Sequence, residues 1–350
     1  MRENRAWDNM SLVPYFDRHE DIYNDFTTGY RLFAVVTFVM KVYYVRRIAS
    51  LSALHINFRI TICNTVISME IMHITLLLGH IYNDLTIDNE NRLGVNIGCT
   101  VLGMLNNIAA VDASVSMLML AVERQLAYNF VDVYETKARA LAWTLVFIML
   151  GISLTVGIFS WYVFMFLYND FDFYTSRMSC LPIHINWFYE VAAFTFSSSS
   201  CLLGAAWLAV LRKSTRQGRL NRLSLRSLSA RFQATENSYT TASIFPSMAT
   251  FVLAAWTGLA IGVYRGILAQ KYGDHTVFSK FLGDVGFLIV DLYSLCHISC
   301  TIAYVPLVKS AFVRDLNRLT CWQMPRKPNK LDCSNAGEIY FDQLKDSWNR

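Results

Sequence analysis

The sequence predicts an all-α membrane protein, a bundle of seven transmembrane helices. Of its 350 residues, 54% are apolar and only 16% are charged, whereas soluble domains contain about a quarter charged residues. The apolar residues also come in long blocks rather than in alternating or narrow stripes, which is typical of chains that cross a bilayer several times. A soluble all-helical protein is the alternative that these blocks disfavour.

Seven blocks have the length that a hydrocarbon core of about 30 Å requires. They cover residues 26–45, 58–81, 94–122, 141–167, 187–211, 242–268 and 281–308. The first block is the least apolar, because its uninterrupted apolar stretch covers only residues 32–40. We expect Arg31 and Lys41 to extend from a tilted helix toward the two membrane surfaces. Residues 1–25 then form an extracellular N-terminus, and residues 309–350 form a cytoplasmic tail.

The basic residues of the connecting segments predict the orientation, since cytoplasmic loops carry an excess of Lys and Arg. One side of the predicted bundle holds 21 basic residues and the other holds seven. The richer side comprises residues 46–57 with Arg59, 123–140, 212–241 and 309–350. The N-terminus is therefore predicted outside and the C-terminus inside. Asn9 begins an Asn-Met-Ser glycosylation sequon, which is usable only if the N-terminus reaches the lumen.

One apolar helix candidate runs from Cys99 to Arg124 and has about the length of a membrane span. At about 1.5 Å per residue it covers roughly 37 Å, so it places Cys99 at the outer face and Arg124 at the cytoplasmic face. Of the eight cysteines, only Cys99 and Cys180 are predicted near the outer face, where a disulfide can form. We therefore predict a Cys99–Cys180 disulfide that ties the third helix to the second outer loop.

An acidic residue and an arginine, Glu123 and Arg124, close the third predicted helix. Their ordinary interpretation is two interfacial charges at a helix terminus. The functional interpretation is an activation switch, in which a neighbouring acid holds the arginine until the helices spread and it meets a G protein. In rhodopsin-like receptors an acidic-Arg pair follows the disulfide cysteine by a similar interval. Gln125 replaces the aromatic residue of that pattern, so the match is partial.

The segment between the fifth and sixth spans is the most basic part of the chain. Leucines and a phenylalanine alternate with arginines over residues 212–232. Two interpretations remain open: solvated positive charge beside anionic lipid, and a cytoplasmic extension of the fifth helix that contacts a G protein. Under the second interpretation, we predict that Arg222, Arg226 and Arg231 make the contact.

Ionisable side chains inside the predicted spans are functional candidates, because placing them in lipid is costly. We predict one shared polar cluster in the bundle interior, made by Glu70, Asp112, Asp291 and His297. Such a cluster would bind a cation or act as the hinge of activation. The alternative is a structural hydrogen-bond network with no role in ligand binding.

Three segments resemble the nematode serpentine chemoreceptors of classes e, a, ab and b. Residues 54–58 (LHINF) look like the His-x-Asn-Leu motif that opens the second helix in that group. Glu123-Arg124, followed by residues 133–137 (VYETK), resembles its Glu-Arg…Tyr-Glu-Lys pattern. Residues 228–237 (LSARFQATEN) are similar to its Leu-Ser-x-Arg-Tyr/Phe-Gln-x-x-Glu-Asn stretch before the sixth helix. The likeness runs from about residue 50 to 320, and class e is favoured.

This resemblance implies a seven-helix bundle of the G-protein-coupled receptor type, in the plasma membrane of sensory neurons. It implies binding of a small-molecule cue, which the sequence does not identify, and activation of a heterotrimeric G protein. A membrane transporter or channel and a non-signalling receptor relative are the alternatives, although no internal repeat is visible. Nothing resembles a nucleophile elbow, a zinc motif or a phosphate loop. We therefore predict no catalytic residue, no cofactor, no metal site and no nucleic-acid partner.

Overall fold

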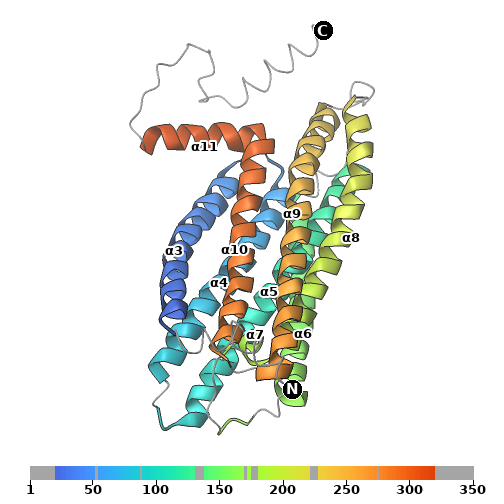
Figure 1. Cartoon of the computed structure of the whole chain (residues 1–350). Helices are drawn as coiled ribbons and strands as arrows, with labels where there is room; N and C mark the ends of the chain where they lie inside the picture. Colours follow the sequence, from blue (N-terminus) through green and yellow to red (C-terminus); the bar gives the residue numbers. More distant parts are fainter. Residues whose placement is uncertain are drawn as a thin grey trace, which may run out of the picture.

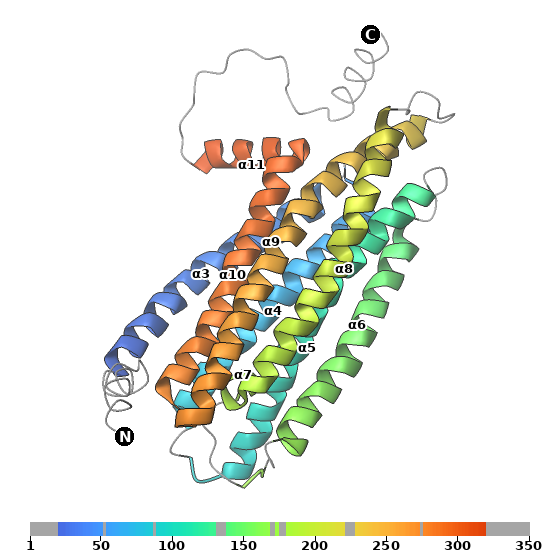
Figure 2. The same cartoon turned by 45° about the vertical axis from the view of Figure 1, so that its right-hand side comes forward.

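The chain folds into a bundle of long helices in the computed structural model (Figures 1 and 2). The structure describes residues 20–51, 54–86, 89–130, 138–168, 172–174, 180–220, 228–273 and 276–319. Among these residues all regular elements are helical. Seven long helices form the bundle, the short α7 lies beside α8 and α10 toward one end of it, and α11 lies across the other end (Figure 1).

The elements and their bounds are α3 (Glu20–Ser50), α4 (Ile56–Thr86), α5 (Arg92–Asn129), α6 (Ala138–Tyr162), η1 (Val163–Leu167), α7 (Pro182–Ile185), α8 (Trp187–Leu220), α9 (Leu228–Tyr272), α10 (Val277–Tyr304) and α11 (Pro306–Leu319). Six helices are long and apolar enough to cross a membrane: α4, α5, α6 with η1, α8, α9 and α10. α3 is as long as α4 but is not among these six. It completes the seven-helix bundle by packing on α4 and α10.

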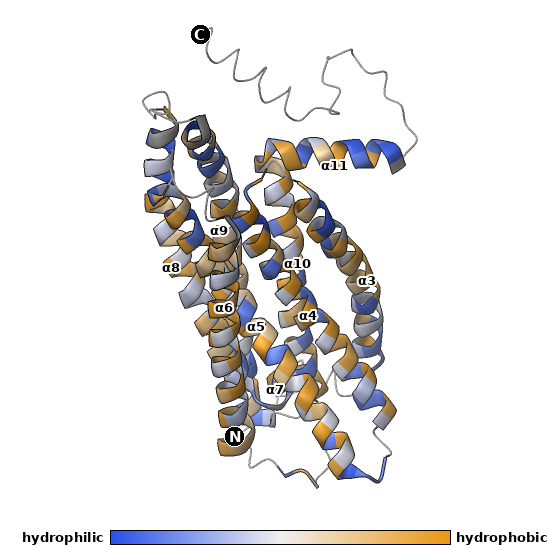
Figure 3. Ribbon diagram, turned by 180° about the vertical axis from the view of Figure 1, so that it is seen from behind, coloured by the Kyte–Doolittle hydropathy of each residue, from blue (hydrophilic) through white to orange (hydrophobic). Residues whose placement is uncertain are grey.

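The core of the bundle forms around α5, which contacts α4, α6, α8 and α9. Met69 of α4, Met117 of α5 and Met248 of α9 belong to the largest buried apolar cluster. Large apolar side chains also face outward, as on α6, where Phe147 and Phe159 are each about two-thirds exposed. Hydrophobic residues run along the long helices (Figure 3), and the exposure of such large apolar side chains suits a bundle surrounded by lipid rather than by water.

Lys41 of α3 is buried inside the bundle, with 1% of its side chain exposed. Its Nζ lies 2.8 Å from Asp291 Oδ1 on α10 and 3.2 Å from Glu70 Oε2 on α4. The prediction that Lys41 extends to the membrane surface is therefore wrong, because its position on α3 faces the two packed helices. Arg31 is exposed and pairs with Asp84 at 3.3 Å.

The last bundle helix begins and ends four residues before the predicted span 281–308. α10 ends at Tyr304, and Val305 adopts an extended conformation (φ −101°, ψ 103°), as expected for a residue before proline. Pro306 then begins α11, which crosses the end of the bundle (Figure 1). Asp315 of α11 lies 3.2 Å from Arg47 Nε of α3, so the first part of the predicted tail is a helix fastened to α3. We call this end of the bundle the Arg124 end, and the end that holds α7 the Cys99 end.

Candidate functional site

Arg124 lies fully buried near the end of α5, where it joins three helices. Its Nε is 2.5 Å from Oε2 of the preceding Glu123, and a second nitrogen donates to Oε1 at 2.5 Å. A third nitrogen, Nη1, donates to Thr240 Oγ1 at 2.6 Å and to Asn237 Oδ1 at 3.1 Å, both on α9. The guanidinium also lies over the ring of Phe58 on α4, 4.6 Å from its centroid.

The burial of Arg124 is tolerable because its charge is compensated on several sides. Two hydrogen bonds to one carboxylate form the strong, planar arrangement that arginine favours, and the Phe58 ring adds a cation–π contact. The bonds to Asn237 and Thr240 reach a second helix, α9. The predicted switch pair therefore connects α5 to α9 in this conformation.

The segments that resemble the family motifs converge on this same region. The His55 backbone N–H, just before α4, donates to Glu236 Oε1 of α9 at 2.7 Å. Glu236 and Asn237 both belong to the LSARFQATEN stretch, and the adjacent Phe58 and Arg124 belong to the other two motifs. Residues 133–137 lie outside the described part of the chain. Tertiary packing thus unites motifs that are far apart in the sequence.

Sequence reasoning recognised residues 228–237 as a motif but assigned no partner to Asn237, and it missed Thr240. The signal that was present is the run of small polar residues that continues the motif into the helix. Of the three arginines predicted to contact a G protein, Arg222 and Arg226 lie outside the described residues. Arg231 lies half-buried in the first turn of α9.

The four residues of the predicted polar cluster are divided among three sites, so the prediction of one shared cluster is wrong. Glu70 and Asp291 do come together through Lys41. Asp291 also lies 2.6 Å from His73 Nδ1 of α4 and accepts a 2.9 Å hydrogen bond from the Tyr30 hydroxyl of α3. This group of five residues, here called the Lys41 cluster, joins α3, α4 and α10.

Asp112 belongs to a second group, between α4, α5 and α6. It accepts hydrogen bonds from Asn64 Nδ2 at 2.9 Å and Ser153 Oγ at 2.9 Å, and another from Ser68. The two groups are separate because Ser68 and Glu70 project from nearly opposite faces of α4, about 160° apart around the helix axis. One face of α4 thus serves α5 and α6, and another serves the Lys41 cluster.

His297 forms a third group, between α9 and α10. Its Nδ1 lies 2.6 Å from Ser247 Oγ, which is also 3.1 Å from the Tyr293 hydroxyl. The Tyr44 ring of α3 lies edge-on to the imidazole, with 6.2 Å between centroids. The site therefore sits between three helices but apart from Asp112 and Asp291.

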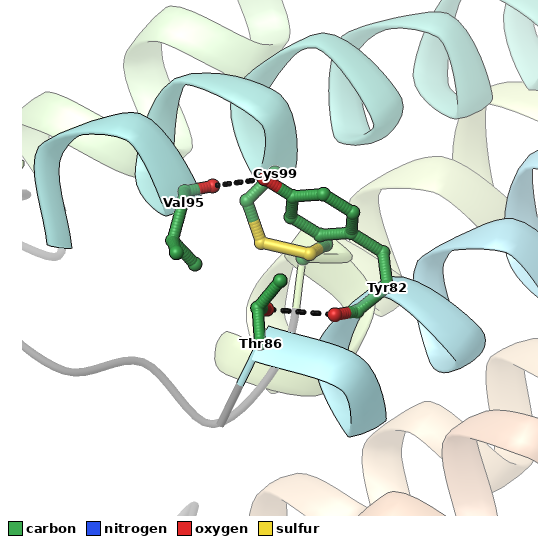
Figure 4. The surroundings of a disulfide bond; sticks show 5 residues. Tyr82, Thr86, Val95 and Cys99 are labelled. Atoms are coloured by element: carbon green, nitrogen blue, oxygen red, sulfur yellow. Dashed lines mark hydrogen bonds between the residues drawn. A yellow bond between two sulfur atoms is a disulfide. The ribbon is translucent and has the colours of Figure 1, made fainter. Parts of the chain in front are cut away.

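At the Cys99 end, Cys99 of α5 and Cys180 form a disulfide with a Cα–Cα distance of 4.6 Å (Figure 4). Beside it the Tyr82 hydroxyl of α4 donates to the Val95 carbonyl of α5 at 3.2 Å. The disulfide thus fixes the segment before α7 to α5, and the tyrosine ties the neighbouring helix to the same turn. Asn9 lies outside the described residues.

The same end contains ionisable groups that sequence reasoning did not assign to a site. Arg265 of α9 is buried, lies 3.1 Å from Glu190 Oε2 of α8, and donates to the His184 carbonyl of α7 at 3.0 Å. His184 Nε2 lies 3.0 Å from Asp284 Oδ1 of α10, and His80 Nε2 of α4 lies 3.2 Å from the same oxygen. His184 was not found because the short helix α7 falls in a predicted loop, where no hydropathy pattern indicates which residues face the bundle.

A comparison with protein families adds an independent finding. The family model described as serpentine type 7TM GPCR receptor class ab chemoreceptor matches residues 26–275, which is more than half of the chain. A search of curated proteins finds no match. The motif resemblance favoured class e and included class ab among its relatives, and the matching model is that of class ab. The chain therefore belongs to the family of serpentine class ab chemoreceptors, which are seven-transmembrane G-protein-coupled receptors.

Proposed function

We propose that this chemosensory receptor is held inactive by the contact of Arg124 with α9, and that release of Arg124 allows a heterotrimeric G protein to bind. The observation that supports the proposal is the pair of hydrogen bonds from Arg124 Nη1 to Thr240 and Asn237. These bonds join a buried charge of α5 to α9. In the proposed scheme they hold the two helices together in the inactive (closed) arrangement and are lost when α9 moves away (the open arrangement). Movement of α9 would release Arg124 Nη1 from Thr240 and Asn237, so that this nitrogen could meet a partner.

The partner would bind at the Arg124 end. There α8 and α9 extend past the neighbouring helices (Figure 2), and Arg212, Lys213 and Arg216 are exposed on α8. With Arg222, Arg226 and Arg231 in the connecting segment and α9, they would present positive charge to an acidic protein surface or to anionic lipid.

A small-molecule cue would bind between the helices in the half of the bundle that contains Cys99. It would favour one of the two arrangements by as much as its affinities for them differ. The disulfide holds Cys180, and with it the adjoining α7, against α5, so α7 would form a wall of the pocket while the Arg124 end of α9 moves. In this scheme the Lys41 cluster lies along the path between the pocket and Arg124.

The double variant Asn237→Ala/Thr240→Val tests the switch without a known ligand. Hydrogen bonds to charged groups contribute roughly 1.5–3 kcal/mol each. Their loss should therefore shift the equilibrium constant between the inactive and active arrangements toward the active one by at least about tenfold. Basal nucleotide exchange on a co-expressed G protein should rise accordingly. Thr235→Val is the matched control, because Thr235 bonds only to the Arg231 carbonyl of its own helix. Unchanged basal exchange, or an equal rise in the control, would contradict the proposal.

We also propose that the receptor lies in the plasma membrane of sensory neurons with its N-terminus outside. The excess of 21 basic residues over seven on the predicted inner side supports this orientation. An antibody should reach an N-terminal tag on intact cells. N-linked glycosylation at Asn9 should raise the apparent mass of the chain, and Asn9→Gln should abolish this increase. A tag reached only after permeabilisation would reverse the orientation.

A further inference from the structure

Three potential metal ligands converge at the Cys99 end from three separate elements. His80 Nε2 of α4 and His184 Nε2 of α7 lie 3.2 and 3.0 Å from the same atom, Asp284 Oδ1 of α10. All three ligand atoms lie within 4.8 Å of one another. His184 and Asp284 are buried, and 16% of the His80 side chain is exposed. We propose that His80, His184 and Asp284 bind a divalent transition-metal ion of the zinc class.

The donor set matches the chemistry of zinc. Two imidazoles and one carboxylate are a known three-ligand set for Zn²⁺, with the fourth position open to water or another donor. Bonds of about 2.0–2.1 Å in a tetrahedral site place neighbouring ligand atoms roughly 3.4 Å apart. The two distances to Asp284 Oδ1 are close to this value, so a small opening of the cluster would admit the ion between the three atoms.

Neighbouring side chains orient two of these ligands, Asp284 and His184, through hydrogen bonds. The Tyr23 hydroxyl of α3 donates to the other oxygen, Asp284 Oδ2, at 2.9 Å, which leaves Oδ1 directed at the two imidazoles. Arg265 donates to the His184 carbonyl and to that of the preceding residue, so the backbone of α7 is anchored to α9. Such supporting hydrogen bonds commonly orient metal ligands.

A neighbouring positive charge, that of Arg265, is balanced by an acidic side chain. A guanidinium nitrogen of Arg265 lies 3.7 Å from the position a Cβ would take at Gly283, close to His184. Its charge is balanced by Glu190, whose Oε2 lies 3.1 Å away. The remaining carboxylate, Asp284, would offset one charge of the ion. Because the ligands come from α4, α7 and α10, the ion would fasten these three elements together.

Zinc and cobalt ions alone can test the site on the full-length receptor in detergent, so the test does not depend on a cue or a G protein. The background variant Cys321→Ser/Cys333→Ser removes two thiols of the tail, because cysteine thiolates are themselves ligands for these metals. After treatment with a chelator, Zn²⁺ should raise the Tm at about one ion per chain, and Mg²⁺ should not. Co²⁺ should give the visible absorption of a tetrahedral site without a thiolate charge-transfer band.

Substitution should locate the site. His80→Gln and Asp284→Asn should each weaken the apparent metal affinity at least tenfold. Tyr23→Phe keeps all three ligands and removes only a supporting hydrogen bond, so it should weaken the affinity by a smaller factor. His55→Gln, at the opposite end of the bundle, should bind metal like the parent. No zinc-dependent rise in Tm, or an equal rise in His80→Gln and Asp284→Asn, would overturn the proposal. If both ligand variants fail to fold, a parent Co²⁺ spectrum of octahedral type would also overturn it.

Discussion

Lys41 on α3 and Asp291 on α10 form a buried ion pair, with 2.8 Å between Nζ and Oδ1. The pair lies inside the bundle, where Glu70 is the second acid beside the same ammonium group. It explains how the least apolar of the seven helices is accommodated. The charge within its span faces acidic protein side chains rather than lipid, so α3 avoids the cost of exposing an ammonium group to the hydrocarbon core.

Replacing Lys41 by Met should strongly destabilise the receptor. The substitution leaves two buried carboxylates without their cation, and removal of one partner of a buried pair typically costs about 3–5 kcal/mol. We expect a clearly lower Tm in detergent. Lys213→Met, which removes an exposed lysine of α8, should leave the Tm nearly unchanged. Addition of Asp291→Asn to Lys41→Met should recover part of the loss, and a strictly additive double variant would argue against direct coupling.

Arg124 should be required for signalling even when α9 is already released. We expect Arg124→Ala, introduced into the Asn237→Ala/Thr240→Val variant, to return basal nucleotide exchange to the background level at equal surface expression. The reason is that the freed guanidinium is the group proposed to meet the G protein. Exchange that stays high in the triple variant would mean that Arg124 only holds the helices together.

Gly157 of α6 allows a close approach to α5. A Cβ at this position would lie 2.9 Å from Ile108 Cα and 2.8 Å from its Cγ1, so the backbone itself would have to move. Small residues permit such contacts between membrane helices, and overpacking costs about 1–3 kcal/mol. Gly157→Ala should therefore lower the Tm. Gly151→Ala on the same helix meets nothing within 4 Å and should be neutral or slightly stabilising; equal effects of the two would refute this packing argument.

Loss of the disulfide should lower stability by an amount that reduction reproduces. Cys99 and Cys180 are 81 residues apart, and a cross-link of this kind typically contributes about 2–4 kcal/mol. We expect a value near 2 kcal/mol, because the bilayer already restricts the unfolded chain. Cys99→Ser/Cys180→Ser should melt at the temperature of the reduced parent and be insensitive to dithiothreitol. If reduction of the disulfide left the Tm of the parent unchanged, the bond would add no stability.

The sequence by itself determined the class of the fold. Apolar blocks of membrane length, interrupted by polar segments, require helices whose backbone groups bond internally, and this requirement holds whatever the neighbours are. The same is true of the chain's family, since the motifs at residues 54–58, 123–124 and 228–237 are local and readable. The pairing of Cys99 with Cys180 was predictable because few cysteines fall on the outer side.

Only the tertiary structure decided which polar groups meet. Glu70, Asp112, Asp291 and His297 all lie within spans, but the rotation of each helix sends them to separate sites. Likewise Lys41 is buried rather than extended to the surface. A hydropathy pattern gives the position of a residue along the membrane normal and leaves open the direction in which its side chain points around the helix. That direction depends on how seven helices pack together, and it brings Arg124 to Thr240 and His184 to Asp284.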